Sequence, residues 1–290
     1  MEGQNPNQTR LRLLARRFTA FAKSFSRSTA VARSMHVFLD LWGVLIDIRK
    51  TDRAYNRRAA SILASRYGGG VKTWLKAYNS AWRNYQSRLE EADWSRHEWF
   101  TVVDRLDKNL ILETFGVAGV ESVPRDVLSF SRNLENEVMS CVAAFYPGAE
   151  GAVRRLHEAG HKVYLATQAG EWHARGALKR SGFANEFDGI FSGSSQNSSK
   201  DQKLYWARVL RSVDAPASSC VSVDDRTDCL KAAASVGFTA VLLERGERGK
   251  SRKLLSSIYS SLHSLRSLPR LLDQLTAGKS QPRRVRPEKV

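Results

Sequence analysis

Carboxylates at the ends of two distant strands are the residues in this sequence best suited to chemistry. Asp40 follows the apolar run 36–39, which is typical of a buried strand, and Gly43 stands three residues later. Far downstream, the apolar run 220–223 ends in the pair Asp224 and Asp225. Open α/β sheets bind ligands beyond the carboxyl ends of their strands, so these side chains are expected to meet at one sheet edge. Together they suggest a nucleophile and a magnesium site.

Two further polar residues complete a set suited to phosphoryl transfer. Thr167 ends another apolar run, and Lys200 precedes a helical segment. In a reaction through an aspartyl phosphate, a carboxylate attacks phosphorus, a divalent cation offsets the repulsion, and a hydroxyl and an ammonium hold the phosphoryl oxygens. Lys203 is an alternative to Lys200, which is preferred because it lies before the helix.

The elements that must position these residues alternate between strand and helix. Strands are expected at 36–41, 162–167, near 190–191, 220–224 and 240–243, with helices between them. Such alternation predicts a Rossmann-like α/β core with a parallel sheet and right-handed crossovers. The segment 252–273 carries apolar residues at helical spacing, which predicts a final amphipathic helix or helix pair.

Residues 52–142 interrupt this alternation with a helical stretch. In its second segment, apolar residues recur every three or four positions and mark one helix face: Trp74, Tyr78, Trp82, Tyr85 and Leu89. Four helices with aromatic inner faces predict a small α-helical bundle inserted between the first strand and the rest of the core. Packing within the bundle explains the aromatic stripe better than a substrate wall does, because large apolar side chains are usually buried.

The chain therefore divides into four parts. Residues 35–50 and 143–275 form the α/β core, residues 51–142 the inserted bundle, and residues 1–34 and 276–290 are basic ends. The first end carries seven basic residues and one acidic residue, and the second carries five and one, so the ends hold most of the formal net charge of +17. They could bind polyanions weakly, but solvated tails are the simpler interpretation, and no specific nucleic acid is expected as a partner.

Composition also bears on the compartment. The three cysteines, Cys141, Cys220 and Cys229, lack metal-site spacing and are odd in number, which favours a reducing compartment over a disulfide scaffold. No apolar run is long enough to span a membrane. A cytoplasmic enzyme is therefore expected. The Arg- and Ser-rich residues 1–34 leave three interpretations open: an organelle-import presequence, a disordered extension, or a natural start at Met35.

In order and setting, these motifs resemble those of the haloacid dehalogenase superfamily of hydrolases. The family's first motif, a hydrophobic strand followed by Asp-x-Asp-Gly and Thr or Val, resembles residues 38–44, Phe-Leu-Asp-Leu-Trp-Gly-Val. Its strand ending in Thr or Ser resembles 163–167, its lysine before a helix resembles 199–205, and its acidic strand end resembles 223–228. The resemblance spans 35–273, and the inserted bundle is similar to the C1-type helical cap of one subclass.

The resemblance implies a set of magnesium ligands. Asp40 would be both the nucleophile and a ligand, and the backbone carbonyl of Trp42 would be a second ligand. Asp225 would be the third, with Asp224 or Asp228 acting through water. Mg²⁺ is therefore the expected cofactor.

The resemblance also implies how substrate is held. Thr167 and Lys200 would grip the phosphoryl group, and Trp42 and Gln168 would line the substrate beside them. The expected function is a magnesium-dependent phosphohydrolase that acts on a small phosphorylated metabolite through an aspartyl phosphate, with the cap closing over the site. The sequence does not indicate the oligomeric state.

Trp42 departs from the family pattern. Family phosphatases carry a second Asp at this position as general acid and base, and help of this kind is worth about 10²–10⁴-fold in rate. The substrate could have a good leaving group, such as an acyl phosphate, or another acid could substitute: Glu171, His173 or His97. The enzyme could also be weak. The alternative functions are a metal-independent dehalogenase, against which the acidic pair argues, and a non-catalytic pseudo-phosphatase that binds a ligand or partner.

Overall fold

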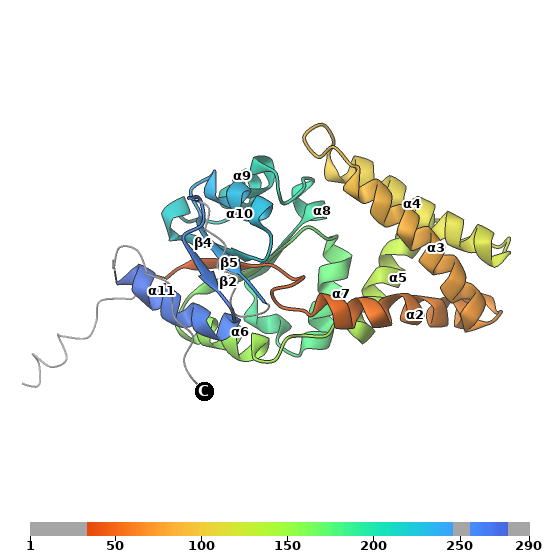
Figure 1. Cartoon of the computed structure of the whole chain (residues 1–290), viewed down its shortest axis with the longest axis horizontal. Coiled ribbons are helices and arrows are strands. Elements are labelled where there is room, and N and C mark those ends of the chain that lie inside the picture. The colour runs from red at the N-terminus through yellow and green to blue at the C-terminus, as the bar shows by residue number, and fades with distance from the viewer. Residues whose placement is uncertain (1–33, 246–255, 278–290) are drawn as a thin grey trace, which may run out of the picture.

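A six-stranded sheet forms the centre of the computed structural model, which describes residues 34–245 and 256–277 (Figure 1). The strands are β1 (His36–Leu39), β2 (Lys162–Thr167), β3 (Gly189–Ser192), β4 (Cys220–Asp224), β5 (Thr239–Leu243) and β6 (Ser260–Leu262). They lie in the order β3-β2-β1-β4-β5-β6, and all neighbouring pairs are parallel. The chain runs outward from β1 through β2 to β3 and then returns to the other side of β1 as β4. The direction of the strand order therefore reverses at β1, and a crevice is expected beyond the carboxyl end of this strand. The predicted parallel α/β sheet is thus confirmed.

Helices cover both faces of the sheet because the strands are apolar on both faces. Val37 and Leu39 of β1 pack on one side with α6, α7 and α11, and Phe38 packs on the other side with α9 and α10 (Figure 1). None of the described helices is long and apolar enough to cross a membrane. The bounds are α6 (Ala149–Glu158), α7 (Glu171–Ser181), α8 (Gly193–Gln196), α9 (Lys203–Ser212), α10 (Thr227–Ala234) and α11 (Leu268–Thr276), with short 3-10 turns at Ala184–Glu186, Ala217–Ser219 and Leu265–Ser267.

Between β1 and α6 the chain forms four helices, here called the insertion. They are α2 (Ile48–Tyr67), α3 (Val71–Glu90), α4 (Trp99–Ala118) and α5 (Val127–Val142). The insertion lies to one side of the sheet and meets the core along α5 and α7 (Figure 1). The two helices approach closely at Gly176, where an added Cβ would lie 2.4 Å from the backbone oxygen of Asn136. The insertion therefore packs directly on the core.

The aromatic stripe of α3 packs within the insertion. Trp74 and Tyr78 are buried, whereas Trp82 and Tyr85 are half-buried. Trp82 stacks on Tyr85 with ring centroids 5.1 Å apart and on Tyr55 of α2 at 5.9 Å. These contacts agree with the prediction that the stripe serves packing.

The C-terminal segment differs from the sequence prediction. A helix or helix pair was expected over 252–273, but residues 260–262 form the edge strand β6 and α11 begins only at Leu268. The backbone of β6 pairs with β5, and this pairing outweighs the helical spacing of the side chains. Pro269 lies in the first turn of α11, where a missing N–H costs nothing. Residues 246–255 and the predictions for 1–33 and 278–290 lie outside the described residues.

Candidate active site

The Asp40 side chain lies at the carboxyl edge of the sheet, next to its central strand β1. The Asp40 N–H donates to the Val223 carbonyl at 3.0 Å, so pairing with β4 continues one residue past β1. The chain then turns sharply, and the Gly43 N–H donates to the Ile46 carbonyl at 3.0 Å. This turn, residues 40–46, is here called the nucleophile loop. Asp40 is 7% exposed, so its carboxylate has little contact with water.

Three carboxylates converge at this edge. Oxygens of Asp40, Asp224 and Asp225 all lie within 4.8 Å of one another. Gly43 makes the approach feasible, because its φ of +75° suits glycine and an added Cβ would lie 1.9 Å from Asp225 Oδ2. Several carboxylate oxygens around one point are the donor set that Mg²⁺ and Ca²⁺ prefer. The residues present therefore fit a divalent cation.

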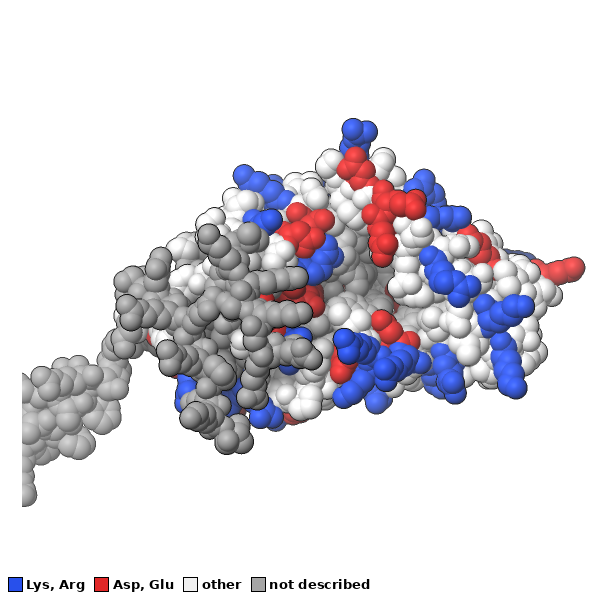
Figure 2. Space-filling view, viewed as in Figure 1, with Lys and Arg blue, Asp and Glu red and all other residues white. Residues whose placement is uncertain are grey.

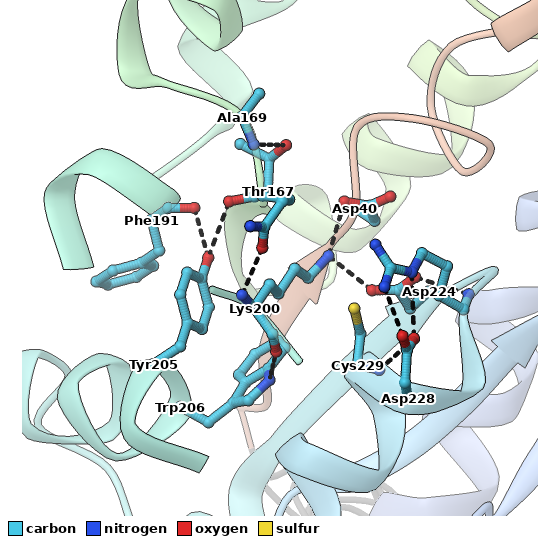
Figure 3. Close-up of polar contacts among 12 residues, drawn as sticks. Asp40, Thr167, Ala169, Phe191, Lys200, Tyr205, Trp206, Asp224, Asp228 and Cys229 are labelled. Atoms are coloured by element: carbon cyan, nitrogen blue, oxygen red, sulfur yellow. Dashed lines mark hydrogen bonds and ion pairs between the residues drawn. The ribbon is translucent and has the colours of Figure 1, made fainter. Parts of the chain in front are cut away.

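Lys200 joins two of these carboxylates. Its Nζ lies 2.7 Å from Asp40 Oδ1 and 2.7 Å from Asp224 Oδ2, and the residue is 1% exposed (Figure 3). The Lys200 carbonyl accepts a hydrogen bond from Trp206 Nε1 at 2.8 Å, which anchors the residue ahead of α9. Lys203, the alternative lysine, is exposed at the start of α9.

The electrostatics show a shortage of positive charge. Burial raises the pKa of Asp40 to about 7, although Lys200 acts in the opposite direction. Burial and the neighbouring Asp224 raise the pKa of Asp225 to about 6. Burial disfavours the charged Lys200, but Asp224 and Asp40 outweigh it and raise the pKa of Lys200. A bound cation would relieve the excess of carboxylates over ammonium.

Thr167 and Gln168 lie beside this cluster, at the end of β2. The Thr167 hydroxyl is buried and accepts a hydrogen bond from the Ala169 N–H at 3.3 Å, which leaves its own proton for another acceptor. The Gln168 side-chain oxygen accepts from the Lys200 N–H and from the Ser199 hydroxyl. Gln168 thus supports the segment that carries Lys200, and its amide NH₂ is the group it can offer to a ligand.

Trp42 faces the insertion. Its half-buried ring lies 5.4 Å from the ring of His173, which stacks on Tyr55 at 6.0 Å. His173 Nδ1 lies 3.4 Å from Glu135 Oε2 of α5, and its Nε2 is buried without a hydrogen-bond partner among the described residues. A column of aromatic rings therefore links the nucleophile loop through α7 to α2, and Glu135 of α5 contacts its middle ring.

The remaining predicted residues differ in how they lie relative to Trp42 and the carboxylate cluster. Of the three substitute acids, His173 lies against the Trp42 ring, Glu171 pairs with Arg175, and His97 is exposed between α3 and α4. Asp228 pairs with Arg226 and is outside the cluster of three carboxylates.

Trp99, at the start of α4, is a contact of the site that sequence reasoning missed. Its Nε1 donates to the Gln168 carbonyl at 3.0 Å, and an added Cβ on Gly193 would lie 2.1 Å from the same nitrogen. The insertion is thereby tied to the loop after β2. On the face shown in Figure 2, a hollow lies between core and insertion, with acidic side chains around its mouth.

Comparison with known proteins supports a family assignment. A family model described as haloacid dehalogenase-like hydrolase matches residues 35–237. No curated protein matches the sequence. Similar solved structures include a 2-haloacid dehalogenase from Pseudomonas syringae pv. Tomato DC3000, with 18% identity, TM-score 0.59 and coverage of 83% of this chain and 99% of that chain. Another is the HAD-hydrolase YfnB from Bacillus subtilis bound to magnesium, with 14% identity, TM-score 0.56 and coverage of 83% and 100%.

A HAD phosphatase from Thermococcus onnurineus is similar at 18% identity and TM-score 0.52, with coverage of 82% of this chain and 97% of that chain. At these identities the structures share a fold, and they include both dehalogenases and phosphatases. The family match covers most of the chain, and the protein therefore belongs to the haloacid dehalogenase-like hydrolases.

Proposed function

We propose that the protein is a magnesium-dependent phosphohydrolase that acts on a small phosphorylated metabolite. The observation that supports this most is the cluster of Asp40, Asp224 and Asp225 oxygens within 4.8 Å of one another. Lys200 lies between two of them with its ammonium in contact with both. A nucleophilic carboxylate beside a cation site and a buried ammonium is the arrangement that transfer of a phosphoryl group to Asp40 requires.

The reaction would use Asp40 twice. A carboxylate oxygen of Asp40 attacks phosphorus, the bond from phosphorus to the leaving oxygen breaks, and the leaving group keeps the electron pair. Water then attacks the phosphorus of the aspartyl phosphate, the bond between phosphorus and the Asp40 oxygen breaks with its electron pair returning to the carboxylate, and the proton lost by the water remains on the released inorganic phosphate. The Lys200 ammonium and the Thr167 hydroxyl would hold the phosphoryl oxygens in both steps. Mg²⁺ bound by Asp40, Asp225, Asp224 and the Trp42 carbonyl would offset the repulsion between nucleophile and phosphate.

Trp42 limits the range of leaving groups. An indole does not donate a proton at neutral pH, so the leaving group must depart without the acid that family phosphatases supply. Acyl phosphates and aryl phosphates meet this condition because their leaving groups are stable anions. The insertion would act as a cap that keeps bulk water from the aspartyl phosphate until the leaving group departs.

A metal-independent dehalogenase is the second candidate. The absence of a second Asp at Trp42 favours it, since family dehalogenases also lack that residue. In this reading Asp40 would attack carbon and displace halide. Such a reaction needs no cation, so the pair Asp224 and Asp225 would not serve as metal ligands in it.

Turnover with and without a chelator tests the proposal. We expect phosphate release from acetyl phosphate and p-nitrophenyl phosphate that needs Mg²⁺, stops with EDTA and is lost in Asp40→Asn. Asp93→Asn is a suitable control because Asp93 is exposed in the loop after α3. Halide release from 2-chloropropionate in EDTA would instead establish the dehalogenase. If no compound turns over in the wild-type protein, the catalytic proposal is wrong and a binding role remains.

A further inference from the structure

The chain passes between the core and the insertion in two segments that pair with each other. The Asp47 N–H donates to the Ala144 carbonyl at 2.8 Å, and the Tyr146 N–H donates to the Leu45 carbonyl at 2.9 Å. Ile46 and Phe145 form an antiparallel bridge between these bonds. We call this pair of segments, 45–47 and 144–146, the hinge ladder. Its first segment overlaps the nucleophile loop, so a movement of the ladder would be transmitted to Asp40 through residues 41–44.

Arg245 contacts the nucleophile loop and the hinge ladder at once. It follows β5, and its Nε donates to the Gly43 carbonyl at 3.0 Å while its Nη2 donates to the Val44 carbonyl at 2.6 Å. The centre of its guanidinium lies 3.7 Å from the ring centroid of Tyr146. The guanidinium has donors in a fixed planar fork, so it can bind two successive carbonyls and stack on a ring at the same time.

The same contacts place a positive charge near the acidic cluster. Arg245 holds the carbonyl of Gly43, and the Cα of Gly43 faces the Asp225 carboxylate. Trp42, whose carbonyl would bind the metal, directly precedes Gly43. A change in the Gly43 backbone would therefore move both the Trp42 carbonyl and the space in which Asp225 lies.

We propose that Arg245 is a positioning residue for the metal site: it fixes the turn at Trp42 and Gly43 and couples that turn to the hinge ladder. The inference rests on the proposed function only for the identity of the ligand, Mg²⁺. Without the guanidinium, the turn has to be ordered when the metal binds. Loss of two charge-assisted hydrogen bonds then predicts metal binding weaker by about tenfold or more.

Arg180 provides a matched control. Its Nε donates to the Ala143 carbonyl at 3.0 Å, so it also holds a carbonyl next to the hinge ladder. Among the described residues, this hydrogen bond of Arg180 lies outside the nucleophile loop. Arg180→Met therefore removes a similar contact while it leaves Gly43 and Val44 untouched.

The test compares Arg245→Met, Arg245→Lys and Arg180→Met in the full chain. Calorimetric titration with MgCl₂ should give a Kd raised about tenfold in Arg245→Met, an intermediate value in Arg245→Lys and a wild-type value in Arg180→Met. Hydrogen exchange in EDTA should be faster at the amides of Gly43 and Ile46 in Arg245→Met alone.

Each result decides one question. If Arg245→Met binds Mg²⁺ like the wild type, or if Arg180→Met weakens binding equally, the positioning role is refuted. If the wild-type protein does not bind Mg²⁺, the proposed function fails at the metal. Exchange at Gly43 and Ile46 then still decides whether Arg245 holds the nucleophile loop, since that measurement uses no metal.

Discussion

The buried carboxyl of Asp40 should make the metal-free protein less stable as pH rises. Burial raises the pKa of Asp40 to about 7, and Asp224 adds to this effect while Lys200 opposes it. In the unfolded chain the same group loses its proton near pH 3.9. Between these values the folded state retains a proton that the unfolded state has released. The free energy of unfolding therefore falls as pH rises from about 4 and levels off above about 7.

The size of this loss of stability follows from the change in the pKa of Asp40 on folding. A change in pKa from 3.8 to about 7 corresponds to about 4 kcal/mol over the whole pH range. Between pH 5 and pH 8 the same linkage gives a loss of about 2–3 kcal/mol from this carboxyl alone. Asp40→Asn removes the titrating group and keeps its size, and Lys200 keeps Asp224 as an ion-pair partner. Between pH 5 and pH 8, the free energy of unfolding should therefore fall by about 2–3 kcal/mol less in Asp40→Asn than in the wild type.

Urea unfolding in EDTA at several pH values from 5 to 8 measures this difference. Saturating MgCl₂ at pH 8 should stabilise the wild type and have a smaller effect on Asp40→Asn. Asp93→Asn, at an exposed position, should show the same pH dependence of the unfolding free energy as the wild type. If Asp40→Asn shows the same pH dependence as the wild type, Asp40 is not the group that burial has perturbed, and the reasoning fails.

Three further substitutions test single contacts of the site. Gly43→Ala should lower the free energy of unfolding by about 1–2 kcal/mol, because alanine is strained in a left-handed conformation. It should also weaken Mg²⁺ binding, because the added Cβ displaces Asp225. Calorimetry that shows unchanged Mg²⁺ affinity would contradict this. Lys200→Met should lower the unfolding free energy by about 3 kcal/mol, because it leaves two buried carboxylates unpaired. In the same urea experiment, the exposed Lys203→Met should have no effect, and equal losses would refute the assignment. Trp42→Asp should speed hydrolysis of alkyl phosphates by about 10²-fold and leave acetyl phosphate hydrolysis nearly unchanged; equal effects on both in a phosphate-release assay would show that position 42 does not act on the leaving group.

The sheet could be predicted because most of its strands are continuous apolar runs bounded by turn residues. The ends of β2 and β4 coincide with the predicted ones, and the change from strand–helix alternation to helical spacing predicts a helical stretch where the structure has α2 to α5. The edge strand β6 was missed for a physical reason. It is three residues long, and its one apolar residue, Leu262, fits a helix as well as a strand, so only pairing with β5 decides its conformation.

The carboxylates and Lys200 could be anticipated together because parallel strands bring their carboxyl ends to the same edge. Their roles in binding and catalysis stay predictions. Arg245 and Trp99 could not be found in this way. Both donate to backbone carbonyls, which every residue offers, and the partners lie 202 residues away for Arg245 and Gly43 and 69 for Trp99 and Gln168. No pattern of residue types marks such contacts, so they emerge only from the fold.

The balance of charge at the site bears on the choice between a phosphate and a haloacid as substrate. Oxygens of Asp40, Asp224 and Asp225 lie close together, and the ammonium of Lys200 contacts the first two of these carboxylates. Both substrates are anions, so either would meet the excess of negative charge that adds to burial in raising the pKa of Asp40 and Asp225. In a metal-independent reaction, this repulsion would raise the activation barrier. With a divalent cation bound, the same carboxylates would be ligands and the site would attract an anion. The acidic pair would thus hinder one reaction and serve the other, and this difference is our reason to propose phosphoryl transfer.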